Sequence, residues 1–112
     1  MGNIPPSVKT VSTLYQTSHG LISVSTRSEP IAGYVVTKEC GLVFATSSSY
    51  TSPAEHDVKV QEAMGLLSNQ AGALGANAVL ALNMEVKDLH GNGKHHMAQV
   101  QMYGTAVVVA GK

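Results

Sequence analysis

One segment constrains the fold more than any other: a helix that stops at a glycine and continues at once as a strand. Before it, Ser52-Pro53-Ala54-Glu55 supplies an N-cap, a first-turn proline and a capping-box glutamate. Apolar residues then recur at helical spacing, and they are Val60, Ala63, Met64, Leu67, Ala71 and Leu74. Gly75 follows at the position of a left-handed helix stop, with Asn77 in the turn. The pattern predicts one long amphipathic helix joined directly to a strand.

Two apolar segments after the helix predict a β-hairpin. Ala78 to Leu82 is continuously apolar, and Thr105 to Ala110 is almost wholly apolar, with Gly104 just before it. Antiparallel pairing about Asn92 brings these two halves together, and a one-residue slip would turn side chains to the wrong face. Strands that are apolar on both faces are covered on both faces. One helix covers one face, so a neighbouring subunit or the N-terminal strands must cover the other.

The N-terminal part carries weaker signals. Residues 1–18 contain two prolines and scattered Ser and Thr, which predict an arm that is ordered only where something holds it. Leu21–Thr26 and Ile31–Thr46 are expected to be strands. We therefore expect a single α+β domain over residues 19–112, with two N-terminal strands, one long helix and a C-terminal hairpin.

Charge is scarce in this chain of 112 residues: 12% of the residues are charged and 44% are apolar. Typical domains carry about 25% charged residues, so this chain either has a polar uncharged surface or hides part of its surface in an oligomer. Seven basic and seven acidic residues cancel, and no basic patch appears, so no nucleic-acid partner is expected. No stretch approaches 18 continuous apolar residues, so no membrane partner is expected either. We expect a soluble, cytoplasmic protein.

The side of the helix opposite its apolar stripe carries small or uncharged residues instead of charged ones. Val58, Gly65, Asn69 and Gly72 are placed there by helical spacing. An interior glycine costs about 1 kcal/mol relative to alanine, and close approach of another backbone is one explanation for two of them on one side. The alternative is that the glycines are incidental. We expect this side of the helix and the segment Thr105–Val109, which we take as a sheet edge, to contact another subunit. Together with the scarcity of charge, they predict a homo-oligomer.

A histidine cluster, His90, His95 and His96, marks the hairpin loop. The expected register makes His90 and His95 cross-strand neighbours with Cβ atoms about 5 Å apart, close enough to share a Zn, Ni or Cu ion. His96 would belong to the other face, and Asp88 could add an oxygen ligand. No Cys-x-x-Cys or His-Glu-x-x-His spacing is present, so the alternative is a polar loop with chance histidines.

Cys40 is the single cysteine, so no intrachain disulfide can form. It is a further candidate for a soft metal ligand, although a lone cysteine is more often a small buried hydrophobic residue. Catalysis has little support. Residues 47–49 are serines without a nucleophile elbow, and Gly72 and Gly75 end a helix instead of opening a phosphate loop. We expect no enzyme.

The run from Ala71 through Leu74-Gly75-Ala76-Asn77-Ala78 to Val79, closed by Gly104-Thr105-Ala106-Val107, resembles the YbjQ family of small bacterial proteins, often described as heavy-metal-binding. The resemblance covers about Ile31 to Val109, and a more distant one is to RcsF-like lipoprotein domains. It implies an α+β fold, a homopentamer with barrel-like sheets, and a structural motif formed by Gly75, Asn77, Gly104 and Thr105. The histidine cluster is not part of the resemblance.

Two functions therefore stay open. The first is a non-enzymatic homo-oligomeric binding or scaffold protein, whose small-molecule, metal or protein ligand binds at the loops. The alternative is a heavy-metal-binding protein that uses the loop histidines in metal homeostasis or sensing. Beyond such a divalent transition metal, no cofactor is expected.

Overall fold

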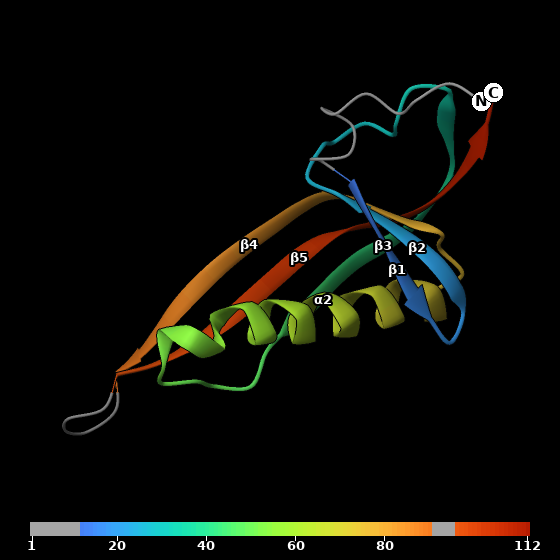
Figure 1. The fold of residues 1–112 in the computed structure, drawn as a ribbon. Coiled ribbons are helices and arrows are strands. Elements are labelled where there is room, and N and C mark those ends of the chain that lie inside the picture. The colour runs from blue at the N-terminus through green and yellow to red at the C-terminus, as the bar shows by residue number, and fades with distance from the viewer. Residues whose placement is uncertain (1–11, 91–95) are drawn as a thin grey trace.

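The computed structural model describes residues 12–90 and 96–112, which form a mixed five-stranded sheet with a helix on one face (Figure 1). The strands are β1 (Ser12–Thr17), β2 (Gly20–Ser25), β3 (Tyr34–Thr46), β4 (Ala78–His90) and β5 (His96–Gly111). A short 3-10 turn, η1 (Pro53–Glu55), leads into helix α2 (His56–Ala73). The strand order is β1-β2-β4-β5-β3, and only β2 and β4 pair in parallel.

The helix begins and ends where the sequence predicts. The Ser52 side chain accepts a hydrogen bond from the backbone of the first turn, and the Glu55 carboxylate accepts one from the Ser52 N–H, which completes the capping box. At the other end Gly75 has a φ of +85°, the left-handed conformation. Both predicted helix signals are confirmed, and the α+β class with them.

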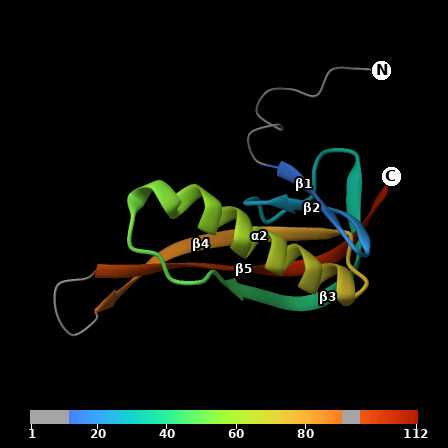
Figure 2. The same cartoon turned by 60° about the horizontal axis from the view of Figure 1, so that its bottom comes forward.

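The main core lies between α2 and the sheet, and Figure 2 shows the helix lying over one sheet face. Leu67 and Ala71 of the predicted stripe are completely buried, whereas Leu74 is 46% exposed, so the buried stripe ends one turn early. Alternate residues of the strands meet this stripe. The buried strand residues of this core are Ile22, Val24, Val43, Ala45, Val79, Val100, Met102 and Ala106.

Three strands, and not two, precede the helix. Strand β1 lies in the segment that the sequence predicted as an arm, and it pairs antiparallel with β2 along its whole length. Its sequence, Ser-Thr-Leu-Tyr-Gln-Thr, is mostly polar, so the alternation that reveals a strand is weak. Tertiary contacts hold it instead, because Tyr15 Oη donates a hydrogen bond of 3.2 Å to Gln61 on α2.

The two glycines predicted on the back of α2 lie in different environments. Gly72 is buried, and a Cβ at that position would lie 2.8 Å from the Cβ of His19 in the turn between β1 and β2. The close approach is therefore made by the chain's own N-terminal hairpin, and Gly72 does not lie on the back. A Cβ at Gly65 would have nothing within 4 Å. The expected sheet edge at Thr105–Val109 is also corrected, since β5 lies between β4 and β3.

A β-bulge divides the predicted hairpin into two registers. At the inner end Ala78 pairs with Val107, as predicted. The ladder then shifts by one residue between Leu80 and Asn83. Ala81 stands in this gap with a φ of +56°, which is unusual for a residue with a side chain. Its N–H donates to a carbonyl outside the hairpin instead of to β5.

The described part of the chain contains no helix that is both long and apolar enough to span a membrane.

Candidate functional site

The turn between α2 and β4 is tied to β5 through Asn77. The Asn77 side-chain amide donates to the carbonyl of Val109 at 2.9 Å, and the Val109 N–H donates back to Asn77 Oδ1 at 2.8 Å. The Asn77 backbone N–H donates to the carbonyl of Val107 at 3.1 Å. Asn77 thus behaves like one more rung of the β4–β5 ladder, and the predicted bond from its side chain to backbone is present.

Gly104 is required by a close crossing of β4 and β5. It is buried, and a Cβ there would lie 2.7 Å from Val79 Cγ1 and 3.1 Å from the Leu80 carbonyl oxygen. Thr105, beside it, pairs with Leu80. These residues, with Gly75 and Asn77, hold the helix stop and the inner hairpin together, so their role here is structural.

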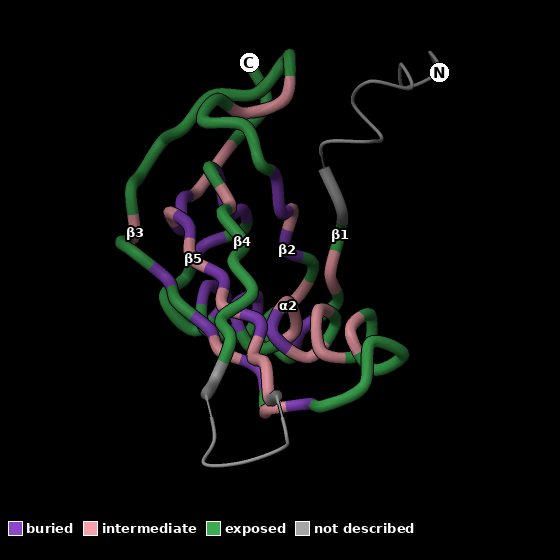
Figure 3. The backbone as a smooth tube through the Cα atoms, turned by 90° about the vertical axis from the view of Figure 1, so that its left-hand side faces the viewer, coloured by how far each residue is buried: buried purple, intermediate pink, exposed green. Residues whose placement is uncertain are grey.

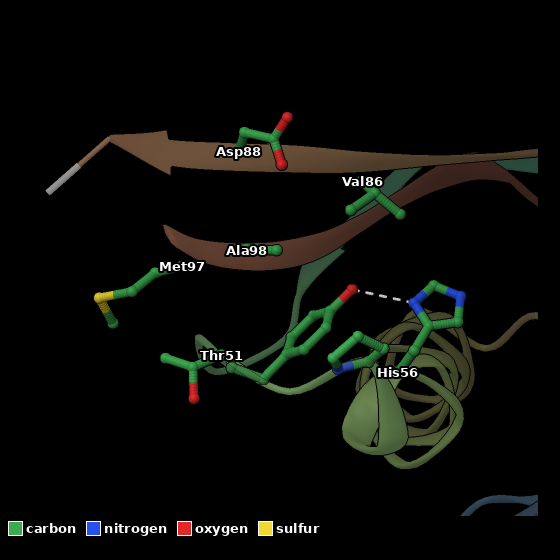
Figure 4. Close-up of a pocket in the computed structure, with 8 residues that line it drawn as sticks. Thr51, His56, Val86, Asp88, Met97 and Ala98 are labelled. Carbon is green, nitrogen blue, oxygen red and sulfur yellow. Dashed lines mark hydrogen bonds between the residues drawn. The ribbon is translucent and has the colours of Figure 1, made fainter. Parts of the chain in front are cut away.

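A hollow of about 500 Å³ lies between the start of α2 and the outer half of the hairpin (Figure 4). We call it the hairpin hollow. Its lining residues come from three places: the loop before the helix, the first turn of α2, and the facing parts of β4 and β5. They are Tyr50, Thr51, Pro53, His56, Val86, Asp88, Met97 and Ala98.

Tyr50 forms the fixed wall of the hairpin hollow. The Tyr50 backbone exchanges two hydrogen bonds of 2.9 Å with Ala98 of β5, and Tyr50 as a whole is only 8% exposed. Its hydroxyl shares a hydrogen bond of 2.9 Å with His56 Nδ1, and the two rings lie 6.0 Å apart at 55°. The loop, the sheet and the helix are thereby joined at one side chain.

The opposite wall belongs to the outer half of β4. Val86 is 47% exposed, and Asp88 is exposed as well. Figure 4 shows both side chains on β4, on the other side of Ala98 from the helix that carries His56. Within residues 12–90 and 96–112 no ion pair or hydrogen bond engages the Asp88 carboxylate. Of the side chains that the structure describes, Asp88 is the only carboxylate that lines the hollow.

The histidine positions differ from the prediction by one residue. Beyond the bulge the backbone of His90 lies opposite His96, and His95 falls outside the described residues. The expected pairing of His90 with His95 is therefore wrong, because the extra residue Ala81 displaces the outer register. Positions 90 and 96 continue the two strands whose residues Asp88 and Ala98 line the hollow.

Cys40 lies apart from these histidines, in β3, where it is partly buried against the main core. Among the described residues, no three His, Cys, Asp or Glu side chains gather closely enough to hold a metal ion. A metal role for His90, His95, His96 or Cys40 stays a prediction.

Sequence reasoning missed the link between Tyr50 and His56. Tyr50 stands in a polar Ser/Thr run, and its pairing with Ala98 joins residues far apart in the sequence. The sequence signal that could have indicated it is a single aromatic residue in a polar loop, because loops often carry binding residues.

Comparisons with known proteins agree with this architecture. A family model named YbjQ_1, with the description "Putative heavy-metal-binding", matches residues 45–110. A solved structure of a protein of unknown function from Pediococcus pentosaceus ATCC 25745, assigned to the DUF74 family, matches with a TM-score of 0.57 and 23% identity, over 80% of this chain and 98% of that chain. That likeness concerns the fold. No curated protein sequence matches. The family model spans the helix, the glycine turn and most of the hairpin, more than half of the chain, so the chain belongs to the YbjQ_1 family.

Proposed function

We propose that this protein is a non-enzymatic, homo-oligomeric binding protein whose subunits join edge to edge through their sheets. One observation supports it above all: within the described residues, each subunit has two long strand edges without a partner. Strand β3 is the last strand of the sheet on one side. On the other side, β2 pairs with β4 only at Ala78 and Val79, so β4 beyond the bulge has no neighbour there.

The β3 edge is both extended and apolar. Leu42 is 73% exposed and Phe44 is 51% exposed, and residues 34–39 are all exposed (Figure 3). Helix α2 covers a small part of this edge, because the Phe44 N–H donates to Gln70 Oε1 at 2.8 Å. The remaining backbone groups of such an edge are a template for another strand.

The β4 edge has the complementary features. Residues 83–88 are all exposed, and Met84 and Val86 are 46% and 47% exposed although they are apolar. Monomeric proteins normally protect long exposed edges with charges, prolines or short strands. Glu85 and Lys87 supply some charge, but the apolar residues on the same edge favour a partner.

Contact between a β3 edge and a β4 edge joins two different surfaces, and contacts of this heterologous kind generate rings when they close. A ring would pair these two edges and produce a continuous, barrel-like sheet, with the outer edge of β1 outside it. The number of five subunits rests on the family resemblance.

Native mass spectrometry and light scattering of the full chain test the assembly. The variants Leu42→Lys and Met84→Lys place a charge on each edge, and we expect each to yield smaller species with unchanged circular dichroism. Leu14→Lys is the matched control, because Leu14 is 64% exposed on β1, a strand that forms neither of these edges. A well-folded monomer of the unaltered protein at micromolar concentration would refute the proposal.

A second candidate function, heavy-metal binding in homeostasis or sensing, is favoured by the register of the outer hairpin. His90 and His96 are directly opposed, and opposed residues have Cβ atoms about 5 Å apart. Histidine is a ligand that suits Zn, Ni or Cu, so two histidines at opposed backbone positions are candidates to share one ion. The family description also names heavy metals.

Calorimetric titration with Zn or Ni separates this candidate from the first. We expect micromolar binding that disappears in the double variant His90→Ala, His96→Ala and persists in His95→Ala. Heat that is absent at micromolar metal, or equally reduced by both variants, would remove this candidate and leave the oligomer proposal untouched.

A further inference from the structure

We propose that the hairpin hollow binds a small organic cation, a primary amine with a short apolar body. This inference names the class of ligand for the proposed binding function, and it rests on that function. The hollow lies within one subunit, and strand pairing along the β4 edge occurs in the plane of the sheet. The two proposals therefore rest on different groups: backbone along the strand edges for assembly, and side chains on one face of the hairpin for the ligand.

The size and construction of the hollow suit a small molecule. It is an open depression of about 500 Å³ with exposed residues on its β4 side, so it suits a small ligand that stays partly in solvent. Its Tyr50 wall is set by two backbone hydrogen bonds to Ala98 and by the hydroxyl bond to His56. A wall that is already ordered lowers the entropic cost of binding.

The charge of the hollow selects a cation. Among the described residues, Asp88 is the only carboxylate in its lining, and no described Lys or Arg lines it. His56 and Tyr50 are the other titratable groups, and they are hydrogen-bonded to each other through His56 Nδ1. The Asp88 carboxylate, unpaired within the described residues, is thus the group that a ligand ammonium would meet.

The apolar part of the ligand has a matching surface. Val86 and Asp88 are two residues apart on β4, so they lie on the same face about 7 Å from each other. Val86 and Ala98 offer carbon atoms on the hairpin side of the hollow, Pro53 lines it from the turn before the helix, and Met97 contributes a thioether (Figure 4). An ammonium at Asp88 would therefore place a body of a few carbon atoms over Val86.

A metal ion fits the same hollow less well. Only His56 and Asp88 offer strong ligand atoms among the lining residues, and His56 Nδ1 is engaged by Tyr50. No group of three such ligands occurs in the described parts of the chain. Metal binding at this place is therefore an outcome that the experiment must be able to reveal.

The test uses three probes that share a phenyl group and have similar length: phenethylamine, neutral phenethyl alcohol and anionic phenylacetate. NMR titration of the full chain should show the amine binding most tightly, with amide shifts centred on Tyr50, Val86 and Ala98. The same titration with ZnCl₂ alone should leave these three amides unshifted at stoichiometric metal. Equal affinity for all three probes, shifts centred elsewhere, or saturation of these amides by zinc would each overturn the inference.

Charge-neutralising variants sharpen the test. Asp88→Asn should weaken phenethylamine binding about three- to fivefold, as for an exposed ion pair, and leave phenethyl alcohol unchanged. Glu85→Gln is the matched control, because it removes the same charge from the opposite face of the same strand. An equal loss in both variants would overturn the inference. Native mass spectra of the same samples report assembly separately, so an intact oligomer without amine preference refutes the ligand class alone.

Discussion

The two ends of the β4–β5 hairpin share one pair of strands and yet differ in almost every physical respect. At the inner end Val79, Leu80 and Val107 are at most 7% exposed, and both faces of the ladder are covered. At the outer end residues 83–88 are all exposed. Register is therefore fixed by burial at the inner end, whereas the outer end takes the register that the bulge at Ala81 gives it.

From this difference we expect the inner end to stabilise the fold and the outer end to serve in assembly or binding. The inner end is stabilised by close packing and by the Asn77 bridge to Val109. The outer end has an unpaired edge, a hollow and an unpaired carboxylate within the described residues. We expect substitutions at the inner end to change the free energy of unfolding, and substitutions at the outer end to change assembly or binding.

Gly104→Val should have the largest effect. The new Cβ would meet Val79 and the Leu80 carbonyl at 2.7 and 3.1 Å, so the strands must separate at this close crossing. We expect a loss of about 3 kcal/mol in the free energy of unfolding, measured by urea denaturation. Thr105→Val, at a half-buried neighbouring position, is the control. A loss below about 1 kcal/mol for Gly104→Val would contradict the close crossing.

Asn77→Ala should come next. It removes the donor and the acceptor that bridge to the Val109 backbone, and we expect a loss of about 1 to 2 kcal/mol by the same measurement. Asn77→Asp keeps the acceptor for the Val109 N–H and loses the donor, so it should lie between the alanine variant and the unaltered protein. Equal stability of all three proteins would show that the bridge contributes nothing.

Gly75→Ala should cost about 1 kcal/mol, because a φ of +85° is unfavourable for a residue with a Cβ. Gly65→Ala is an informative control, because it should change the free energy of unfolding in the opposite direction. Its Cβ would have nothing within 4 Å, and an interior helical alanine is favoured over glycine by about 1 kcal/mol. If both variants changed the free energy of unfolding in the same direction, helix propensity, and not the left-handed stop, would govern the effect at Gly75.

Ala81→Gly should have the smallest effect. Relief of the left-handed alanine at φ +56° gains about 1 kcal/mol, and the added freedom of glycine in the unfolded chain offsets most of it. We expect a net gain of about 0.5 kcal/mol or less, with NMR contacts between the backbones of His90 and His96 unchanged. A loss above about 1 kcal/mol would argue against a left-handed bulge at this residue.

The parts of the fold that the sequence predicts correctly are those with local causes. Ser52 and Glu55 cap the helix through neighbouring residues, and Gly75 ends it through its own φ. Asn77 could also be predicted, because a short amide in a tight helix-to-strand turn has few partners besides backbone. By contrast, β1 owes its existence to pairing with β2, and its polar residues give no alternation to detect.

The candidate site could be predicted only in part, because three of its features have no local signal in the sequence. Alanine is not expected at positive φ, so nothing in the sequence marks Ala81 as a bulge, and the pairing of His90 was displaced by one. Gly72 was assigned to the wrong side of α2 because the turn that contains His19 was not expected to lie there. The hollow depends on the pairing of Tyr50 with Ala98, which no local pattern indicates.

The two-rung parallel ladder between β2 and β4, at Ser23–Ala78 and Val24–Val79, has a consequence for how the chain folds. Helix α2, β4 and β5 are contiguous in sequence and can associate with little loss of loop entropy. The β1–β2 hairpin must close a much longer loop before it docks beside them. We therefore expect this hairpin to join the folded chain last and to open first, with the fastest native-state hydrogen exchange among the strands.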